Sequence, residues 1–128
     1  MILSIVLALL LASTPVVAHE MTPTYPKPKP APIKGVVKYE LSLFNARRDV
    51  DFYELGVFDA DWNPIRFAAT DRIIKVPTNV RVNFDIYIRK EDMDVASYIC
   101  SKSKLIADGS VTPVVSSVIC SRIDGELP

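Results

Sequence analysis

The chain is short of the residues that most metal and catalytic sites use. Its 128 residues include one histidine, two cysteines and four glycines. Zinc fingers need three or more His or Cys ligands, and phosphate-binding loops need clustered glycines, so neither kind of site is expected. Triads of the Ser-His-Asp kind need a histidine inside the fold, whereas the single histidine, His19, comes early in the chain. The sequence therefore predicts a protein that is not an enzyme.

An excess of charge of one sign is also absent, because 15 basic side chains balance 15 acidic ones. Nucleic-acid binders normally carry a basic excess, and so do polybasic membrane-surface proteins. We therefore expect no nucleic-acid partner. The 49% of hydrophobic residues excludes a disordered chain and favours one globular domain.

Residues 1–18 have the pattern of a secretory signal peptide. An almost unbroken apolar run fills residues 1–12, shorter than the roughly 20 residues that span a bilayer. Val16 and Ala18 fit the small-residue positions before a signal-peptidase site, although no Lys or Arg precedes the run. We expect cleavage before His19 and a secreted or periplasmic product that meets the membrane only during export. The alternative is an uncleaved N-terminal anchor.

Residues 19–35 are expected to form a proline-rich extended arm. Five of the ten prolines fall between residues 22 and 32, and the Pro-Lys alternation at 26–30 favours polyproline II. We predict a stiff segment that leads into the domain. The alternative is a ligand for an aromatic groove on another protein.

Residues 36–124 read as short β-strands, followed by a C-terminal tail at 125–128. Apolar and polar residues alternate at 37–43, at 53–57 and, most clearly, at 80–89. Turn-forming residues at 59–64, 77–79 and 108–110 separate the runs. About seven short strands without helical periodicity predict an all-β fold, a single antiparallel sandwich or small barrel.

The two cysteines, Cys100 and Cys120, sit in similar surroundings that could face each other across a hairpin. An exported protein can oxidise such a pair, so we predict a structural disulfide. The alternative, a redox-active pair, would be expected to show Cys-x-x-Cys spacing and a nearby histidine, and neither is present.

Residues 94–100 have the form Asp-x-Ala-x-Tyr-x-Cys, which resembles the entry into strand F of immunoglobulin domains. This resemblance implies an immunoglobulin-like sandwich with a tyrosine corner, in which Tyr98, near Asp94, would bond back to upstream backbone. The turn at 59–64 and the Pro77 turn before the run at 80–89 also look like the N-terminal domain of PapD-type pilus chaperones. Those chaperones have two domains, and their client-anchoring Arg and Lys match no motif here.

A further resemblance concerns small exported proteins encoded by marine bacteriophages. It rests on the segments at 19–26, 58–64 and 98–101, and it implies an origin without an assigned activity.

One constellation suggests a metal. Cleavage before His19 would join a terminal amine to an imidazole, a copper-type chelate, with Glu20 and Met21 adjacent. Copper-carrying periplasmic β-barrels and copper monooxygenases begin their mature chains in this way, with at least one further histidine that this chain lacks.

Our principal hypothesis is an exported, non-enzymatic binding or structural module without a cofactor, whose partner is a protein of the envelope or of a virion. Tyr87, the large aromatic on the polar face of the run at 80–89, is the interface candidate. The alternatives are a periplasmic copper-binding protein that uses His19 and a pilus-chaperone-like protein.

Overall fold

The computed structural model describes residues 19–104 and 115–123, which form eight β-strands and one short 3₁₀ helix. The elements are β1 (His19–Thr22), β2 (Lys29–Pro30), β3 (Val36–Asn45), β4 (Phe52–Asp59), β5 (Ile73–Lys75), β6 (Arg81–Arg89), η1 (Lys90–Asp92), β7 (Ala96–Ser103) and β8 (Val118–Arg122). The predicted signal peptide, the turn at 108–110 and the tail at 125–128 lie outside the described residues. Within the described ranges, no helix is long and apolar enough to cross a membrane.

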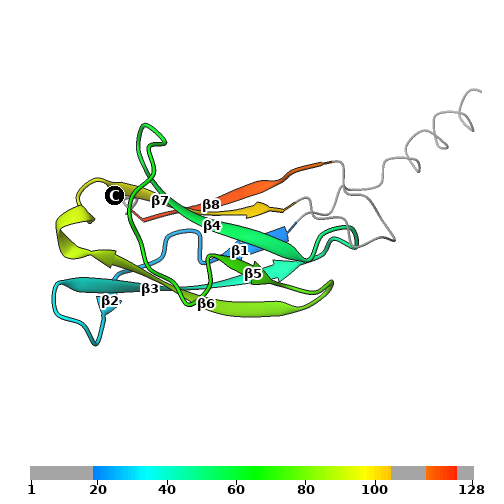
Figure 1. Cartoon of the computed structure of the whole chain (residues 1–128), viewed down its shortest axis with the longest axis horizontal. Coiled ribbons are helices and arrows are strands. Elements are labelled where there is room, and N and C mark those ends of the chain that lie inside the picture. Colours follow the sequence, from blue (N-terminus) through cyan, green and yellow to red (C-terminus); the bar gives the residue numbers. More distant parts are fainter. Residues whose placement is uncertain (1–18, 105–114, 124–128) are drawn as a thin grey trace, which may run out of the picture.

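The strands form two antiparallel sheets that pack face to face (Figure 1). In sheet A, β3 pairs with β6 on one side and with both β1 and β2 on the other. Sheet B has the order β5-β4-β7-β8. Pairing β3 with β6 and β4 with β7 gives the Greek-key connectivity of immunoglobulin-like sandwiches. The predicted all-β sandwich is confirmed, with eight strands in the described part of the chain.

Alternation along the strands builds the core between the sheets. In β3, alternate side chains from Val37 to Leu43 point inward, and β6 contributes Ile86 and Ile88, which are 0% and 1% exposed. From sheet B, Val57 and Ile99 are buried to the same degree. Burying alternate apolar side chains from both sheets provides the main driving force for this packing.

The predicted proline-rich arm is partly built into sheet A. Strand β1 pairs with residues 42–45 of β3, and β2 pairs with Val37 and Lys38. The ammonium group of Lys29 lies 2.7 Å from Glu40 and adds an ion pair between β2 and β3. Proline is tolerated in β2 because this strand lies at a sheet edge, where a missing N–H costs little. These two stretches of residues 19–35 are therefore strands of the sandwich.

Candidate functional site

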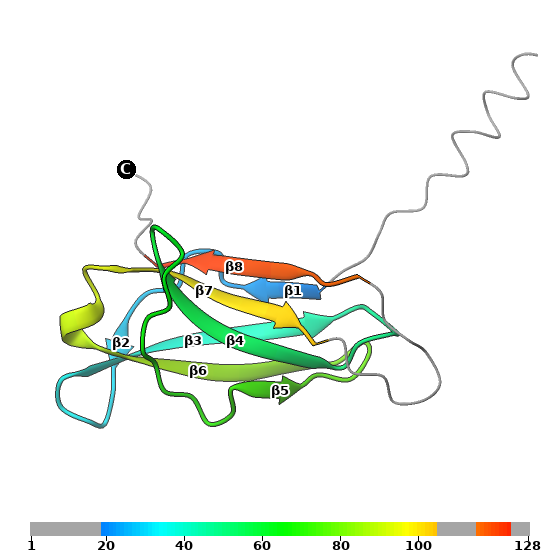
Figure 2. The same ribbon diagram turned by 45° about the horizontal axis from the view of Figure 1, so that its top comes forward.

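One long side of the sandwich, which we call the closed flank, joins the two sheets through β1 and β8 (Figure 2). The backbone N–H of Arg122 donates to the Thr24 carbonyl over 2.8 Å, and the Ser121 hydroxyl donates to the Pro23 carbonyl over 2.7 Å. These backbone groups of the closed flank are therefore hydrogen-bonded within the fold.

The opposite side, which we call the open flank, runs along β5 and β6 (Figure 2). Tyr87 exchanges two backbone hydrogen bonds with Ala68 on the side of β6 that faces away from β3. Since successive residues of an antiparallel strand turn their backbone groups to opposite sides, those of Asn83 and Asp85 also face away from β3. Neither residue has an outward backbone partner among the described residues. The open flank therefore exposes a strand edge that can accept another strand.

Apolar side chains lie directly beside this edge. Val82 and Phe84 point toward the core but stay only partly buried, and Ile74 of β5 faces them. Between the two strands is a hollow of about 440 Å³. Its lining residues are Ala69, Thr70, Asp71, Ile74, Lys75, Val82, Asn83, Phe84 and Asp85. A segment that paired with β6 could place alternate apolar side chains in this hollow.

The predicted interface residue, Tyr87, lies at the end of the unpaired edge of β6, which we call the free edge. The outward backbone groups of Tyr87 itself are bonded to Ala68. Its side chain lines a second hollow of about 290 Å³ on the outer face of sheet A. Ile33, 66% exposed, and Phe67 line the same hollow. The Tyr87 hollow thus continues the open flank, and the interface prediction remains a proposal.

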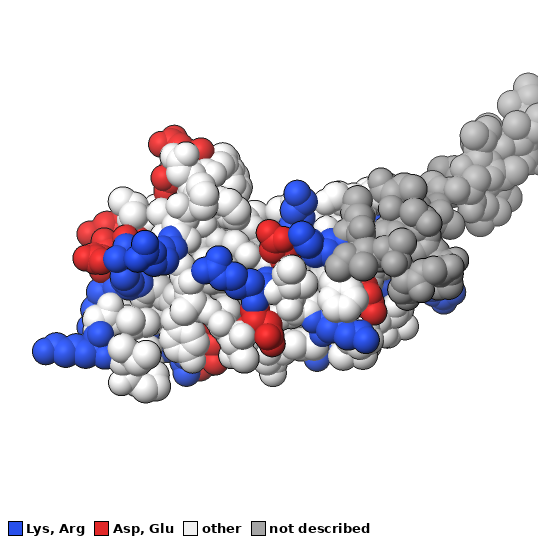
Figure 3. All heavy atoms as spheres, viewed as in Figure 1, with Lys and Arg blue, Asp and Glu red and all other residues white. Residues whose placement is uncertain are grey.

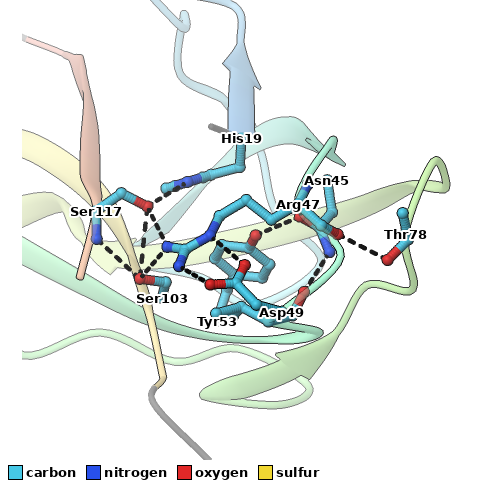
Figure 4. Close-up of polar contacts among 9 residues, drawn as sticks. His19, Asn45, Arg47, Asp49, Tyr53, Thr78, Ser103 and Ser117 are labelled. Atoms are coloured by element: carbon cyan, nitrogen blue, oxygen red, sulfur yellow. Dashed lines mark hydrogen bonds and ion pairs between the residues drawn. The ribbon is translucent and has the colours of Figure 1, made fainter. Parts of the chain in front are cut away.

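The proposed copper residues do not converge on one point. His19 and Met21 face inward, whereas Glu20 is exposed on the outer face, because neighbours in a strand point to opposite sides. His19 is 2% exposed, and its Nε2 lies 2.9 Å from the Ser101 hydroxyl. Its Nδ1 lies 3.1 Å from the Ser117 hydroxyl (Figure 4). Both ring nitrogens are engaged, so a terminal chelate would require β1 to leave the sheet. Among the described residues, no group of three or more His, Cys, Asp or Glu could hold a metal ion.

His19 belongs to a polar network at the end of the closed flank (Figure 4). Arg47, 8% exposed, forms a bidentate ion pair with Asp49 at 2.8 and 2.6 Å. Its remaining terminal nitrogen reaches the hydroxyls of Ser103 and Ser117 at 3.3 and 3.4 Å. This pairing lowers the pKa of Asp49, and burial together with the nearby Arg47 charge lowers the pKa of His19.

Asn45 organises the other half of the network. Its Nδ2 donates to the carbonyls of Val50 and Val76 at 2.6 and 2.8 Å. Its Oδ1 accepts from the Tyr53 hydroxyl and from the Arg47 backbone N–H at 2.5 and 2.9 Å. Burial raises the pKa of Tyr53 to about 12, so this phenol stays protonated as a donor. Every buried side-chain nitrogen and oxygen in the described part of the chain has a partner, which indicates that the network serves the fold.

The disulfide is present where the sequence predicts it. Cys100 and Cys120 are register partners in β7 and β8, and their sulfur atoms are bonded. They join neighbouring strands of one sheet, whereas the immunoglobulin disulfide joins the two sheets. The described residues include no free cysteine.

Tyr98 differs from the expected tyrosine corner. Its inward neighbours, Ser97 and Ile99, are buried, so Tyr98 lies on the outer face of sheet B. Its ring stacks on Trp62 with a centroid distance of 4.3 Å and an interplanar angle of 7°. Within the described residues, its hydroxyl bonds to no upstream backbone group, and Asp94 is exposed beside the corner. The conformation of this corner therefore does not follow the immunoglobulin pattern that its sequence resembles.

The residues that sequence reasoning missed are those of the free edge, Asn83 and Asp85, with Ile74 across the hollow. The alternation at 80–89 predicts a half-buried strand, yet it carries no signal for which edge of that strand is left unpaired. A related signal was available in the short, proline-terminated run before Pro77, which is typical of a weak edge strand.

Comparisons with protein-family models, with curated protein sequences and with solved structures each gave no match.

Proposed function

We propose that the protein is an exported, non-enzymatic binding module that holds an extended segment of a partner protein by strand addition along β6. The observation that carries this proposal is the unpaired outward backbone of Asn83 and Asp85 beside a hollow whose mixed lining includes the partly buried side chains of Val82 and Phe84. In strand addition, main-chain hydrogen bonds supply affinity and pockets for alternate side chains supply specificity. The open flank offers both features.

The edge also has features that limit indiscriminate pairing. Arg81 and Asp85 place charged side chains on the outer face, and the free stretch ends where Ala68 pairs with Tyr87. Charges and short free stretches are the usual means by which exposed edges avoid aggregation. A fitting partner would therefore be short, extended and apolar at alternate positions, with its apolar side facing Val82 and Phe84.

Export supports a partner in the envelope or on a virion. The Cys100–Cys120 disulfide fits an oxidising environment, and residues 1–18 have the signal-peptide pattern. A pilus-chaperone-like role would use the same binding mode, since those chaperones also pair a strand with their clients. The engaged ring nitrogens of His19 make the copper alternative less favourable than either.

The test separates backbone pairing from ordinary surface contact. Peptides that bind the purified protein are selected from a random displayed library, and their affinities are compared for wild type, Asn83→Pro and Asn83→Ala. Proline removes the outward N–H that would join the added strand, whereas alanine retains it. We expect Asn83→Pro to weaken binding at least about tenfold and Asn83→Ala to leave it nearly unchanged.

Hydrogen exchange on the wild-type protein provides a measurement that does not depend on the proline variant folding. Bound peptide should slow exchange at the amides of Asn83 and Asp85. Equal binding by the two variants, unchanged exchange at both amides, or a library without binders would contradict strand addition.

A further inference from the structure

A second surface, independent of the proposed strand-addition site, lies on the outer face of sheet B. It consists of Phe58 on β4, Trp62 in the following turn and Tyr98 on β7, and we call it the aromatic platform. Trp62 and Tyr98 are stacked in parallel, and the centroids of Phe58 and Trp62 are 6.2 Å apart. The Trp62 residue is 55% exposed, so one face of its indole rests on Tyr98 while much of the side chain meets solvent.

The turn holds Trp62 in a defined position. One carboxylate oxygen of Asp59 accepts the backbone N–H groups of Asp61 and Asn63, both at 2.9 Å. The Trp62 N–H donates to the Asp59 carbonyl at 3.1 Å, and Trp62 has a φ of 66°. A bulky residue in this left-handed region is uncommon, and such outliers are a reason to look for function. Because the Trp62 ring is already held in place, ligand binding does not cause the loss of conformational entropy that ordering this ring would cost.

Gly56 makes room for the third ring. A Cβ at this position would lie 2.8 Å from Phe58 Cε2, so the Phe58 ring occupies the space above the glycine. Gly56 is the register partner of Cys100, which places the Cys100–Cys120 disulfide beside the rings on the same face. The platform is therefore an apolar strip on two strands, in which the indole lies parallel to the Tyr98 ring and the Phe58 ring is tilted by 52° against the indole.

The backbone cannot contribute to recognition here. Strand β7 pairs with β4 and β8, and β4 near Phe58 bonds to Asn63 and Ile65 on its other side, so most main-chain groups next to the rings already have partners. A ligand on the platform must be bound through side chains alone, which disfavours the strand addition open to an extended peptide.

Charges of both signs border the platform. Asp59 and Asp61 lie at the turn, and Arg122 is the register partner of Tyr98 on the same face. Figure 3 shows that acidic and basic side chains are interspersed over the face of the molecule that it draws. Carboxylates accept hydrogen bonds from hydroxyl groups. An exposed indole face bordered by carboxylates suits a neutral ring that carries hydroxyl groups around its rim and C–H groups on its face.

We infer that the aromatic platform binds a neutral oligosaccharide with equatorial hydroxyls, one pyranose ring stacking on the exposed face of Trp62. In β-linked glucose or N-acetylglucosamine, the hydroxyls point outward from the ring and the C–H bonds present an apolar face to the indole. Asp61, whose carboxylate has no hydrogen-bond partner among the described residues, is placed to accept a sugar hydroxyl.

Trp62 is the single tryptophan of the chain, so intrinsic fluorescence reports on this site alone. Cellohexaose and chitohexaose are titrated into the purified protein, with maltohexaose as the α-linked comparison. We expect a saturable change in emission for at least one β-linked sugar and a weaker change for maltohexaose. Tetramethylammonium and oligolysine test whether the ring with its two aspartates recognises a cation instead.

Calorimetry on variants connects the signal to the platform. Trp62→Asn removes the ring while keeping a residue that tolerates positive φ, and it should weaken sugar binding at least about tenfold. Val80→Ala, a truncation at an exposed position just before β6, should leave binding unchanged. Binding that survives Trp62→Asn, binding of the cations instead of the sugars, or no response to any hexasaccharide would overturn the inference. None of these outcomes depends on peptide binding at β6.

Discussion

The two flanks of the sandwich use the same kind of strand in opposite ways. At the closed flank, β1 pairs with β3 while inward polar side chains, His19 and Ser121 among them, bond across to other segments. At the open flank, a hollow lies between β5 and β6, lined by Ile74, Val82 and Phe84 together with polar residues. The closed flank is thus joined by hydrogen bonds between segments of the two sheets, from side chains and from backbone, and the open flank has a hollow at the corresponding place.

This contrast predicts how stability is distributed. Buried, fully bonded polar groups are costly to disrupt, whereas a partly exposed edge can be altered at little cost. We therefore expect substitutions in the network at the closed flank to change the free energy of unfolding most, and substitutions at the open flank to change binding.

The largest effect is expected from Asn45→Ala. The change leaves two carbonyls, the Tyr53 hydroxyl and the Arg47 N–H without the partner that Asn45 supplies. The free energy of unfolding should fall by about 4 kcal/mol, measured by urea denaturation. Asn83→Ala is the matched control on the open flank and should cost less than about 0.5 kcal/mol. Similar losses for the two asparagines would refute the contrast between the flanks.

The next effect concerns the disulfide, which fastens β8 to β7 and so supports the closed flank. The sequence separation of 20 predicts a loss of about 3 kcal/mol when the crosslink is absent. A Cys100→Ala/Cys120→Ala double variant should unfold at lower urea and exchange faster at the amides of β8 and β1. Exchange at β6 should remain at the wild-type rate, apart from what global unfolding contributes. If β6 loosens as much as β8, the two flanks are not separate units.

The sequence predicts much of this fold because alternation is a local property. The run at 80–89 marks β6 and its inward side, and the similar surroundings of the two cysteines mark the hairpin that joins them. The free edge of β6 is not local, because it depends on which strands reach it from elsewhere in the chain. The pairing of β3 with β6 joins segments about 45 residues apart, and no local pattern specifies it.

Two errors of interpretation have physical causes. In β7, the buried positions include Ser97, Ser101 and Ser103, which read as solvent-facing in a hydrophobicity pattern. These serine side chains are small, and the hydroxyls of Ser101 and Ser103 have hydrogen-bond partners in the network, so the serines can face inward. Because neighbouring residues of a strand point to opposite faces, Tyr98 then lies on the outer face. The four residues of β1 were read with the prolines that follow them, which concealed a short amphipathic strand.

The smallest effect, the response of β1 to acid, tests whether His19 seals the closed flank. Its pKa is lowered from 6.5, chiefly by burial, so the unfolded chain binds a proton before the folded protein does. Stability is complete above about pH 6.5 and should decline as pH falls below that value, by at most about 1.4 kcal/mol per pH unit. Arg47 faces the ring and stays charged throughout, and Asp49, with its lowered pKa, titrates only at lower pH.

Urea denaturation of wild type and His19→Gln between about pH 7 and pH 5 isolates this contribution, because glutamine retains hydrogen-bonding groups without a proton to gain. The wild-type protein should lose stability over this range, and amide exchange in β1 should accelerate first. The variant should stay nearly flat. If the pH profiles of wild type and His19→Gln are parallel, His19 does not hold the closed flank together. Met21 and the β1–β3 hydrogen bonds would then do so, and the polar network would be a consequence of that packing.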